Sequence, residues 1–220
     1  MGIPCFSVEP SEEAVRELRR YARTSDGWTC EGGYHSVSVR LPGTFPVAWS
    51  EPDPEDGFRS LAALDPASYD GETPWPTHCT CGYEFRQEDH WQLNQHQLYV
   101  ATDGPMVGQR WPQNELPPGA IWTAWWMHSQ WAGINGTDTV LMVKLPSGQE
   151  FLPGMEATNC TRKGEDHDCW CVHGEVPNLT INKQPVEGRS TCQAGAGSID
   201  SCAGTPRHWH GFVTNGELVG

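Results

Sequence analysis

The sequence predicts an α+β fold with a small mixed or antiparallel sheet, two helices and long loops. Bound zinc is expected to crosslink this fold. Three observations support this prediction. Apolar residues make up only 37% of the 220-residue chain, against roughly 45–50% in ordinary domains, while 24 glycines and 18 prolines favour loops. Two segments carry apolar residues at helical spacing, and several others resemble strands. Nine cysteines and nine histidines gather mainly in polar stretches, as metal ligands do.

The N-terminal segment, residues 1–41, is predicted to contain a helix followed by a strand. Ser11 is a suitable N-cap for a helix over residues 12–22, where acidic residues come first and apolar side chains recur on one face. The arginines on the other face are expected to lie in solvent. Residues 35–41 alternate polar and apolar side chains, which predicts a half-buried strand.

Residues 42–76 are predicted to be an extended acidic insert. Seven prolines and the acidic run at 51–56 interrupt any regular pattern there. The main Cys/His-rich domain is expected over residues 77–220 and should form one compact unit with 1–41.

The main domain is predicted to hold the second helix and most of the strands. Residues 119–128 place Ile and Trp at helical spacing after two prolines that suit a helix start. Asn215-Gly216 is typical of a two-residue hairpin turn. Strands are expected at 139–145, 149–152, 178–181, 208–214 and 217–219.

A polar segment at residues 160–174 concentrates three cysteines and two histidines. Thiolate and imidazole are ligands that Zn²⁺ prefers, and a polar loop lets several of them converge on one ion. In a chain with few aliphatic residues, the free energy of ligation also stabilises the fold. The predicted ligands of this C-terminal site are Cys160, Cys169, Cys192 and His210, with His167 and His173 in reserve.

The segment Cys79-Thr-Cys81-Gly82 predicts a second zinc site. It resembles a zinc knuckle, although the usual knuckle has two residues between its cysteines and this one has one. Gly82 permits the positive φ that such a turn needs. Cys30 and His35 complete a set of four with Cys79 and Cys81, so we expect the protein to bind one or two Zn²⁺ ions.

Charge and composition argue against several classes of function. A formal net charge of −14 is opposite to what a nucleic-acid groove requires. No window approaches the roughly 18 consecutive apolar residues of a membrane span, and residues 1–12 lack the features of a secretory signal. The odd number of cysteines, nine, favours metal-bound thiols over a disulfide framework. We therefore expect a cytoplasmic protein with a protein partner and with neither nucleic acid nor membrane.

A set of short motifs covers nearly the whole chain outside residues 42–76. They include C-T-C-G-Y-E-F at 79–85, P-P-G-A-I-W at 117–122, A-G-A-G-S-I at 194–199 and H-G-F at 210–212. Taken together, they resemble a group of proteins encoded by actinobacteriophages. The resemblance implies a phage origin and the host cytoplasm, with the virion as an alternative, and supplies no mechanism. In these relatives Cys171 looks replaceable by Val, and His208 looks less typical than His210.

These features lead to three interpretations of the function. Saturated zinc sites predict a phage accessory protein that acts by protein interaction, and the sequence favours this non-enzymatic role. The first alternative is a zinc-dependent hydrolase using His208 and His210, with Glu175 or Asp166 as base. His173-Gly-Glu175 matches half of a zinc deaminase signature, but no P-C-x-x-C follows it. The second alternative is a virion or assembly component with exposed tryptophans as its contact surface.

Overall fold

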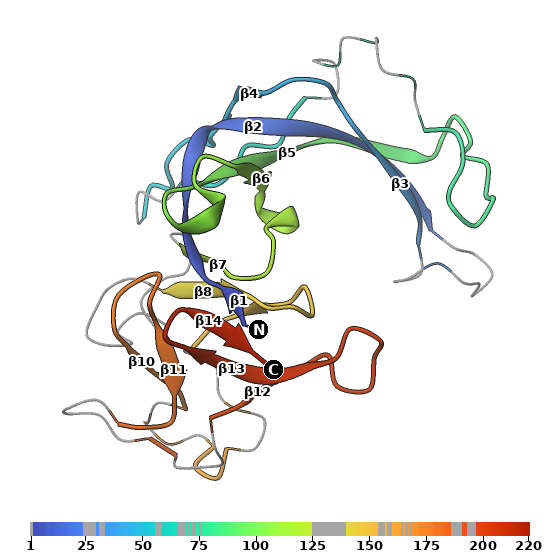
Figure 1. Cartoon of the computed structure of the whole chain (residues 1–220). Coiled ribbons are helices and arrows are strands. Elements are labelled where there is room, and N and C mark those ends of the chain that lie inside the picture. The colour runs from blue at the N-terminus through green and yellow to red at the C-terminus, as the bar shows by residue number, and fades with distance from the viewer. Residues whose placement is uncertain are drawn as a thin grey trace. The chain divides into compact units, whose positions relative to one another are not determined.

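The chain folds mainly as β-sheet (Figure 1). Strands account for 46% of the described residues and helices for 4%, and these residues contain no helix of seven residues or more. The predicted α+β class with two helices is therefore wrong. The computed structural model describes residues 2–23, 30, 34–55, 59–65, 69, 71, 74, 76–124, 140–153, 157, 160–163, 165, 167, 169–185, 191–192 and 197–220.

Two compact units make up the chain. Unit 1 comprises Met1–Pro10, Tyr99–Trp111 and Glu115–Gly220, and unit 2 comprises Ser11–Leu98 and Pro112–Asn114. Unit 2 thus takes in the Pro-rich segment 42–76. Two long strands, β2 (Phe6–Arg23) and β5 (His90–Ala101), contribute residues to both units (Figure 1).

Unit 2 is built on the part of β2 from Ser11 onward. The strand β3 (Tyr34–Arg40) pairs with it antiparallel, as residues 35–41 predicted, and β4 (Phe45–Pro46) pairs with it near Ala14. In the sheet order β5 lies on the other edge of β2. The 42–76 segment packs here too, because Leu64 bridges to Leu93 and joins its apolar cluster.

The predicted helix over residues 12–22 is instead part of β2. Its apolar residues have helical spacing because Ala14 and Val15 are buried on opposite faces of a strand that is covered on both. Arg20, expected in solvent, shares the face of Leu18. Its guanidinium donates to the carbonyl oxygens of Pro76 (3.3 Å) and Arg86 (2.5 Å) and lies over the Phe85 ring. An arginine whose two terminal nitrogens donate to backbone carbonyl oxygens thus occupies a position where the strand pattern requires an apolar residue.

Unit 1 contains a six-stranded antiparallel sheet and a second group of strands. The six-stranded sheet has the order β1-β14-β13-β11-β10, with β12 paired to β13. Its strands are β1 (Ile3–Pro4), β10 (Cys171–His173), β11 (Thr180–Asn182), β12 (Ile199–Ser201), β13 (Trp209–Thr214) and β14 (Glu217–Val219).

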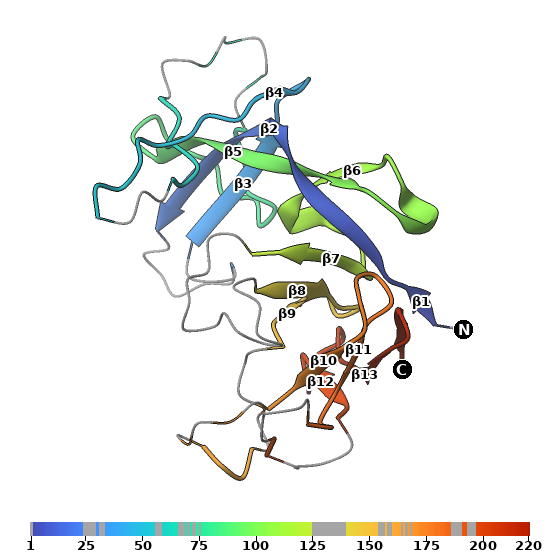
Figure 2. The same ribbon diagram turned by 90° about the vertical axis from the view of Figure 1, so that its left-hand side faces the viewer.

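The second group of strands in unit 1 contains β7, which pairs in parallel with the start of β2. Figure 2 shows β7, β8 and β9 as successive neighbours, and both of their pairings are antiparallel. Among the described residues of this part, two short 3-10 helices lie outside the strands. The bounds are β6 (Arg110–Pro112, beside β5), β7 (Ala120–Thr123), β8 (Leu141–Lys144), β9 (Glu150–Phe151), η3 (Gly104–Met106) and η4 (Gln113–Glu115).

The predicted helix over residues 119–128 is wrong at its start, where β7 runs from Ala120 to Thr123. Residues 125–128 lie outside the described part of the chain. Ile121 and Trp122 are both buried, at 1% and 2% exposure, and belong to different apolar clusters on the two faces of the strand. A strand covered on both faces produces a continuous apolar run that periodicity does not distinguish from a helix.

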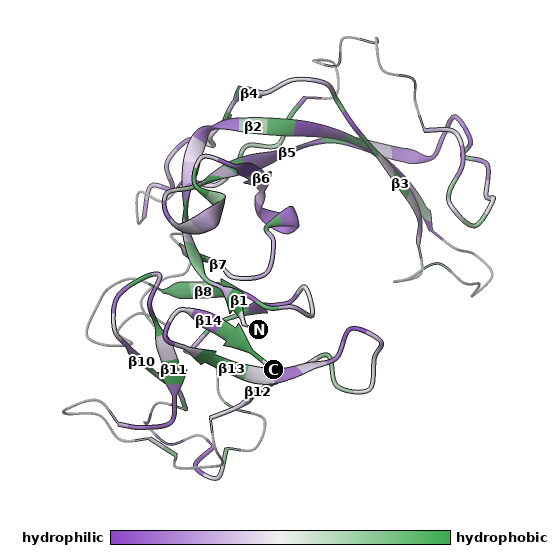
Figure 3. Cartoon of the chain, viewed as in Figure 1, coloured by the Kyte–Doolittle hydropathy of each residue, from purple (hydrophilic) through white to green (hydrophobic). Residues whose placement is uncertain are grey.

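The predicted hairpins are confirmed where the structure describes them. β8 and β9 pair around residues 145–149, and β13 and β14 pair around Asn215-Gly216. Asn215 and Gly216 have φ values of 48° and 75°, as a type I′ turn requires. Figure 3 colours β8 and β14 mostly hydrophobic, in keeping with their place beside buried clusters.

The main apolar cluster of unit 1 lies between the six-stranded sheet and the β7–β8 strands. Ile121 and Val143 contribute from one side, and Ile181 and Val213 from the other. Three cysteines from loops complete it, and they belong to the candidate site: Cys160, Cys169 and Cys192.

Among the described residues, no helix combines the length and the apolar composition that crossing a membrane requires.

Candidate metal centres

Two sets of four Cys and His side chains converge, one set in each unit. The N-terminal site consists of Cys30, His35, Cys79 and Cys81, and the four ligand atoms lie within 4.8 Å of one another. The C-terminal site consists of Cys160, His167, Cys169 and Cys192, with the same spread of ligand atoms. Both sets can hold a metal ion, and both have the Cys₃His composition of structural zinc sites.

The N-terminal distances from Cys30 are close to the edges of a zinc tetrahedron, and the sulfur distances to His167 in the C-terminal site are shorter. With Zn–S near 2.3 Å and Zn–N near 2.0–2.1 Å, tetrahedral geometry gives S–S edges of about 3.8 Å and S–N edges of about 3.6 Å. In the N-terminal site the Sγ atoms of Cys30 and Cys79 are 3.6 Å apart, and Nδ1 of His35 is 3.5 Å from Cys30 Sγ. In the C-terminal site Nε2 of His167 lies 3.1 Å from Cys160 Sγ and 3.3 Å from Cys169 Sγ.

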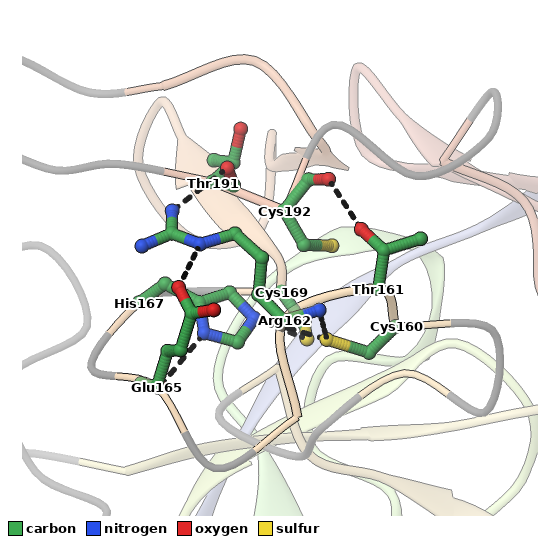
Figure 4. Close-up of polar contacts among 8 residues, drawn as sticks. All are labelled: Cys160, Thr161, Arg162, Glu165, His167, Cys169, Thr191 and Cys192. Atoms are coloured by element: carbon green, nitrogen blue, oxygen red, sulfur yellow. Dashed lines mark hydrogen bonds and ion pairs between the residues drawn. The ribbon is translucent and has the colours of Figure 1, made fainter.

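Loops around β10 and β11 position the C-terminal site (Figure 4). Cys160 follows a turn closed by its N–H to Ala157 O (2.9 Å), and Cys169 precedes β10. Nδ1 of His167 lies 2.8 Å from Glu165 O. A proton on Nδ1, donated to that carbonyl, leaves the Nε2 lone pair facing the sulfurs, which is the usual orientation of a metal-bound histidine.

Arg162 ties the two halves of the C-terminal site together. Its backbone N–H donates to Cys160 Sγ (3.3 Å), and its guanidinium donates to Glu165 Oε2 (2.8 Å) and to Thr191 O (3.5 Å). Figure 4 shows this side chain reaching from the 160–167 loop to the strand residue beside Cys192. Arg162 therefore connects the loop that bears Cys160 to the segment that bears Cys192.

Lys183 supplies a positive charge next to the C-terminal site. Lys183 as a whole is 9% exposed, and its ammonium lies 3.5 Å from Cys192 Sγ and 4.8 Å from the centre of the Trp170 ring. The Thr191 hydroxyl donates to Lys183 O (2.9 Å), which holds this residue beside the loop that bears Cys192. Three thiolates and one Zn²⁺ would carry a net charge of −1, which this buried ammonium would compensate.

Burial makes the C-terminal thiols unfavourable as free thiolates. Burial, with the nearby thiols of Cys160 and Cys192, raises the pKa of Cys169 to about 12. All three sulfurs belong to residues no more than 8% exposed. A metal ion would replace the proton that the Cys169 thiol otherwise retains at neutral pH.

A tight turn positions two ligands of the N-terminal site. The Cys79 N–H donates to Tyr83 O (2.8 Å), the Gly82 N–H donates to Cys79 O (2.9 Å), and Gly82 has a φ of 90°. His35 comes from β3. Cys79-Thr-Cys81-Gly82 thus forms a knuckle with one residue fewer than usual, as the sequence suggested.

An aromatic stack orients His35. Its ring lies parallel to the Tyr83 ring, with the centroids 4.1 Å apart and an interplanar angle of 1°. The Tyr83 hydroxyl donates to Asp89 Oδ2 (3.1 Å), and the same oxygen accepts the Arg86 N–H (2.7 Å). The two histidines are therefore positioned differently: His35 by ring stacking, and His167 by a hydrogen bond.

The pKa values of two N-terminal thiols are shifted in opposite directions. The hydrogen bond with Cys81, and burial, raise the pKa of Cys30 to about 12. Burial also opposes ionisation of Cys79, yet the backbone N–H of Cys81 and neighbouring hydrogen bonds lower its pKa to about 6. Three sulfurs this close cannot all carry negative charge without a counter-ion, so a divalent cation suits the set.

The N-terminal site opens onto a hollow of about 510 Å³. Its three cysteines line the hollow together with Arg19, Tyr34, Ser36 and Thr80. The exposure of these cysteines ranges from buried Cys79 through half-buried Cys30 to exposed Cys81.

The other predicted residues that the structure describes lie outside both sulfur clusters. His210 is exposed in β13, with Nε2 3.0 Å from Ser198 Oγ, so His167 from the reserve set accompanies the three cysteines instead. The second reserve residue, His173, has Nε2 3.1 Å from Asn182 Oδ1. His208 pairs with Asp200 (2.7 Å) at the surface, and Glu175 is exposed in a turn. Asp166 lies outside the described residues.

Sequence reasoning did not identify the residues that support the ligands, namely Lys183, Arg162 and Tyr83. For two of these residues, the sequence contains a feature that could have pointed to their role. Tyr83 follows the knuckle glycine, and Lys183 is an isolated cation between two ligand-bearing segments.

Comparison of the chain with protein-family models, with curated proteins and with solved structures finds no match.

Proposed function

We propose that the protein binds two structural Zn²⁺ ions, one in each unit, and acts through protein contacts rather than catalysis. One observation carries the zinc assignment: each site brings four protein ligand atoms within 4.8 Å of one another, in the composition Cys₃His. Four such ligands complete the tetrahedral coordination of Zn²⁺ and leave no position for a substrate or an activated water.

The surroundings of the ligands also support zinc. The His167 hydrogen bond to Glu165 O and the Lys183 ammonium beside Cys192 are the kinds of support that bound metals require. Cysteine-rich sites of this composition favour Zn²⁺ over the oxygen-preferring cations Mg²⁺ and Ca²⁺.

A contact surface for a protein partner is proposed on the outer face of the β13–β14 hairpin. Phe212 and Val219 lie opposite each other there and are 37% and 43% exposed. Exposed apolar pairs of this kind often form the centre of a protein interface. In the phage setting that the resemblance implies, the partner would be a phage or host protein.

The zinc proposal is tested by elemental mass spectrometry of the untagged protein, with thiol counts before and after chelation. Two zinc ions per chain are expected, with six of the nine cysteines protected until the chelator is added. Zinc-free protein with nine reactive thiols would overturn the proposal.

Two histidine variants provide a matched pair. His167→Ala should lose one zinc ion, whereas His210→Ala should retain both, because only His167 lies beside the sulfurs. The reverse result would place the C-terminal ion at His210.

The interaction proposal has its own test. The double variant Phe212→Ser, Val219→Ser should keep two zinc ions and its near-UV circular dichroism but fail to co-purify the partner from phage-infected cells. Unchanged co-purification would exclude this face as the contact surface. A hydrolase, in contrast, would retain its fold but lose turnover in the His208→Ala variant.

A further inference from the structure

The two sites differ in how far water reaches their sulfur atoms. In the N-terminal site Cys81 is exposed and Cys30 is half-buried, and both line the hollow on unit 2. In the C-terminal site Cys160, Cys169 and Cys192 are all buried, with exposures between 6% and 8%. A small molecule in solution therefore has access to ligand sulfur at one site and not at the other.

We propose that Cys81 is an oxidation site, at which a two-electron oxidant such as hydrogen peroxide forms a Cys81–Cys30 disulfide and releases Zn²⁺ from the N-terminal site. This inference rests on the zinc occupancy proposed above. Zinc ligation keeps Cys81 as a thiolate, and oxidation of cysteine depends on thiolate character and on access. The hollow provides that access from solvent.

The chemistry proceeds in two balanced steps. The Cys81 thiolate attacks one oxygen of the peroxide, so that an S–O bond forms, the O–O bond breaks, and hydroxide leaves a sulfenic acid on Cys81. The Cys30 thiolate then attacks that sulfur, an S–S bond forms, the S–O bond breaks, and a second hydroxide leaves. Two thiolates have lost two electrons to one peroxide. The zinc ion retains two protein ligands and dissociates.

The structure selects Cys30 as the resolving thiol. Its Sγ lies within 4.8 Å of Cys81 Sγ, and both residues line the same hollow. Cys79 is separated from Cys81 by a single residue, and a disulfide across so short a loop is strained. Cys30 comes from a distant part of the chain and carries no such constraint.

Peroxide titration of the zinc-loaded, full-length protein tests this inference. A chromogenic chelator reports released zinc, and peptide mapping by mass spectrometry locates the first disulfide. We expect one zinc ion per chain to be released at a rate on the order of tenfold higher than that of the second ion. The first disulfide should link Cys30 to Cys81. Simultaneous release of both ions, no release, or a first disulfide among the C-terminal cysteines would overturn the inference.

Two variants sharpen the result. Cys81→His retains four donor atoms but removes the exposed thiolate, so zinc release by peroxide should slow by on the order of tenfold. Cys202→Ser changes a half-exposed cysteine outside both sites and should leave the rate unchanged. If Cys81→His fails to bind its zinc, the wild-type mapping decides the question alone.

The titration separates the two proposals. A protein isolated without zinc refutes the proposed function and this inference together. A protein that holds two zinc ions and loses them at equal rates refutes only the inference.

Discussion

The N-terminal and C-terminal sites share one ligand composition but differ in what surrounds them. The C-terminal cysteines belong to the main apolar cluster of unit 1, between two groups of strands. In the N-terminal site Cys79 joins a small cluster with Ala22 and Phe85, and Cys81 faces solvent. The same combination of ligands therefore contributes to the buried core of unit 1 but lies at the surface of unit 2.

The difference extends to the groups that support the ligands. A hydrogen bond and a buried ammonium support the C-terminal set, through Glu165 O and Lys183. Stacking on Tyr83 supports the N-terminal set. We therefore expect loss of metal to unfold more of the chain at the C-terminal site, and the following predictions are arranged from the largest expected effect to the smallest.

The largest effect is expected for Cys169→Ser, which should abolish the folded state of unit 1. Ligation of a structural zinc is worth about 10–16 kcal/mol, comparable to the whole stability of a domain, about 5–15 kcal/mol. The measurement is near-UV circular dichroism with zinc content. Cys171→Ala is the matched control, since Cys171 is 1% exposed and lies outside the ligand set. The Cys171→Ala variant should retain both zinc ions and lose about 1–2 kcal/mol in its free energy of unfolding. A cooperatively folded Cys169→Ser protein would contradict the comparison.

Cys81→Ser should remove one zinc ion and loosen unit 2 alone. Hydrogen exchange should lose protection in residues 34–40 and 76–85, while β13 and β14 remain protected, because stability is distributed over local cooperative units. Cys202→Ser serves as the control. Loss of protection throughout unit 1 would show that the N-terminal ion supports more of the chain than its surroundings indicate.

Lys183→Met should weaken zinc binding at the C-terminal site by about 10- to 100-fold, because the ammonium that compensates the site's negative charge is removed. Chelator competition measures the change. Lys163→Met, which removes an exposed lysine from the neighbouring loop, should leave the affinity unaltered. Equal effects from both variants would indicate a general charge effect in place of a local one.

The smallest effect is expected for Tyr83→Phe. The ring that stacks on His35 remains, and only the hydrogen bond to Asp89 is lost. The denaturant midpoint of unit 2 should fall only slightly, and the protein should keep both zinc ions. Zinc loss in this variant would mean that the hydroxyl, and not the stack, positions the ligand.

Local spacing and side-chain chemistry made most of the candidate ligands predictable from the sequence. The knuckle at Cys79 and the cluster around Cys160 are short-range patterns, and metal coordination restricts which residue types can satisfy them. The candidate for the fourth ligand of the C-terminal site was harder to identify, because it depends on where the chain turns. His210 was predicted to tie the loop to the last hairpin, but the hairpin places that side chain on its outer surface, and the nearer His167 turns inward.

The fold class failed for a different reason. The segments around Leu18 and Trp122 lie in strands covered on both faces, and such strands lose the alternation that distinguishes them from helices. Partners distant in sequence determine that coverage. Arg20 adds to the ambiguity, because backbone carbonyl oxygens satisfy its charge at an inward-facing position.

Within each unit, the chain segments that lead from one unit to the other run side by side. In unit 2, the Ser11 hydroxyl donates to Leu98 O (3.0 Å), and in unit 1, the Thr102 N–H donates to Ser7 O (3.0 Å). Residues 11–98, which form unit 2 together with residues 112–114, therefore begin and end at neighbouring points, as an inserted module does. Such a module can be gained, lost or exchanged by recombination at two neighbouring points. A short turn that joins Pro10 to Tyr99 would cut β2 and β5 at the unit boundary and leave the six-stranded sheet and the candidate zinc ligands of unit 1 uninterrupted.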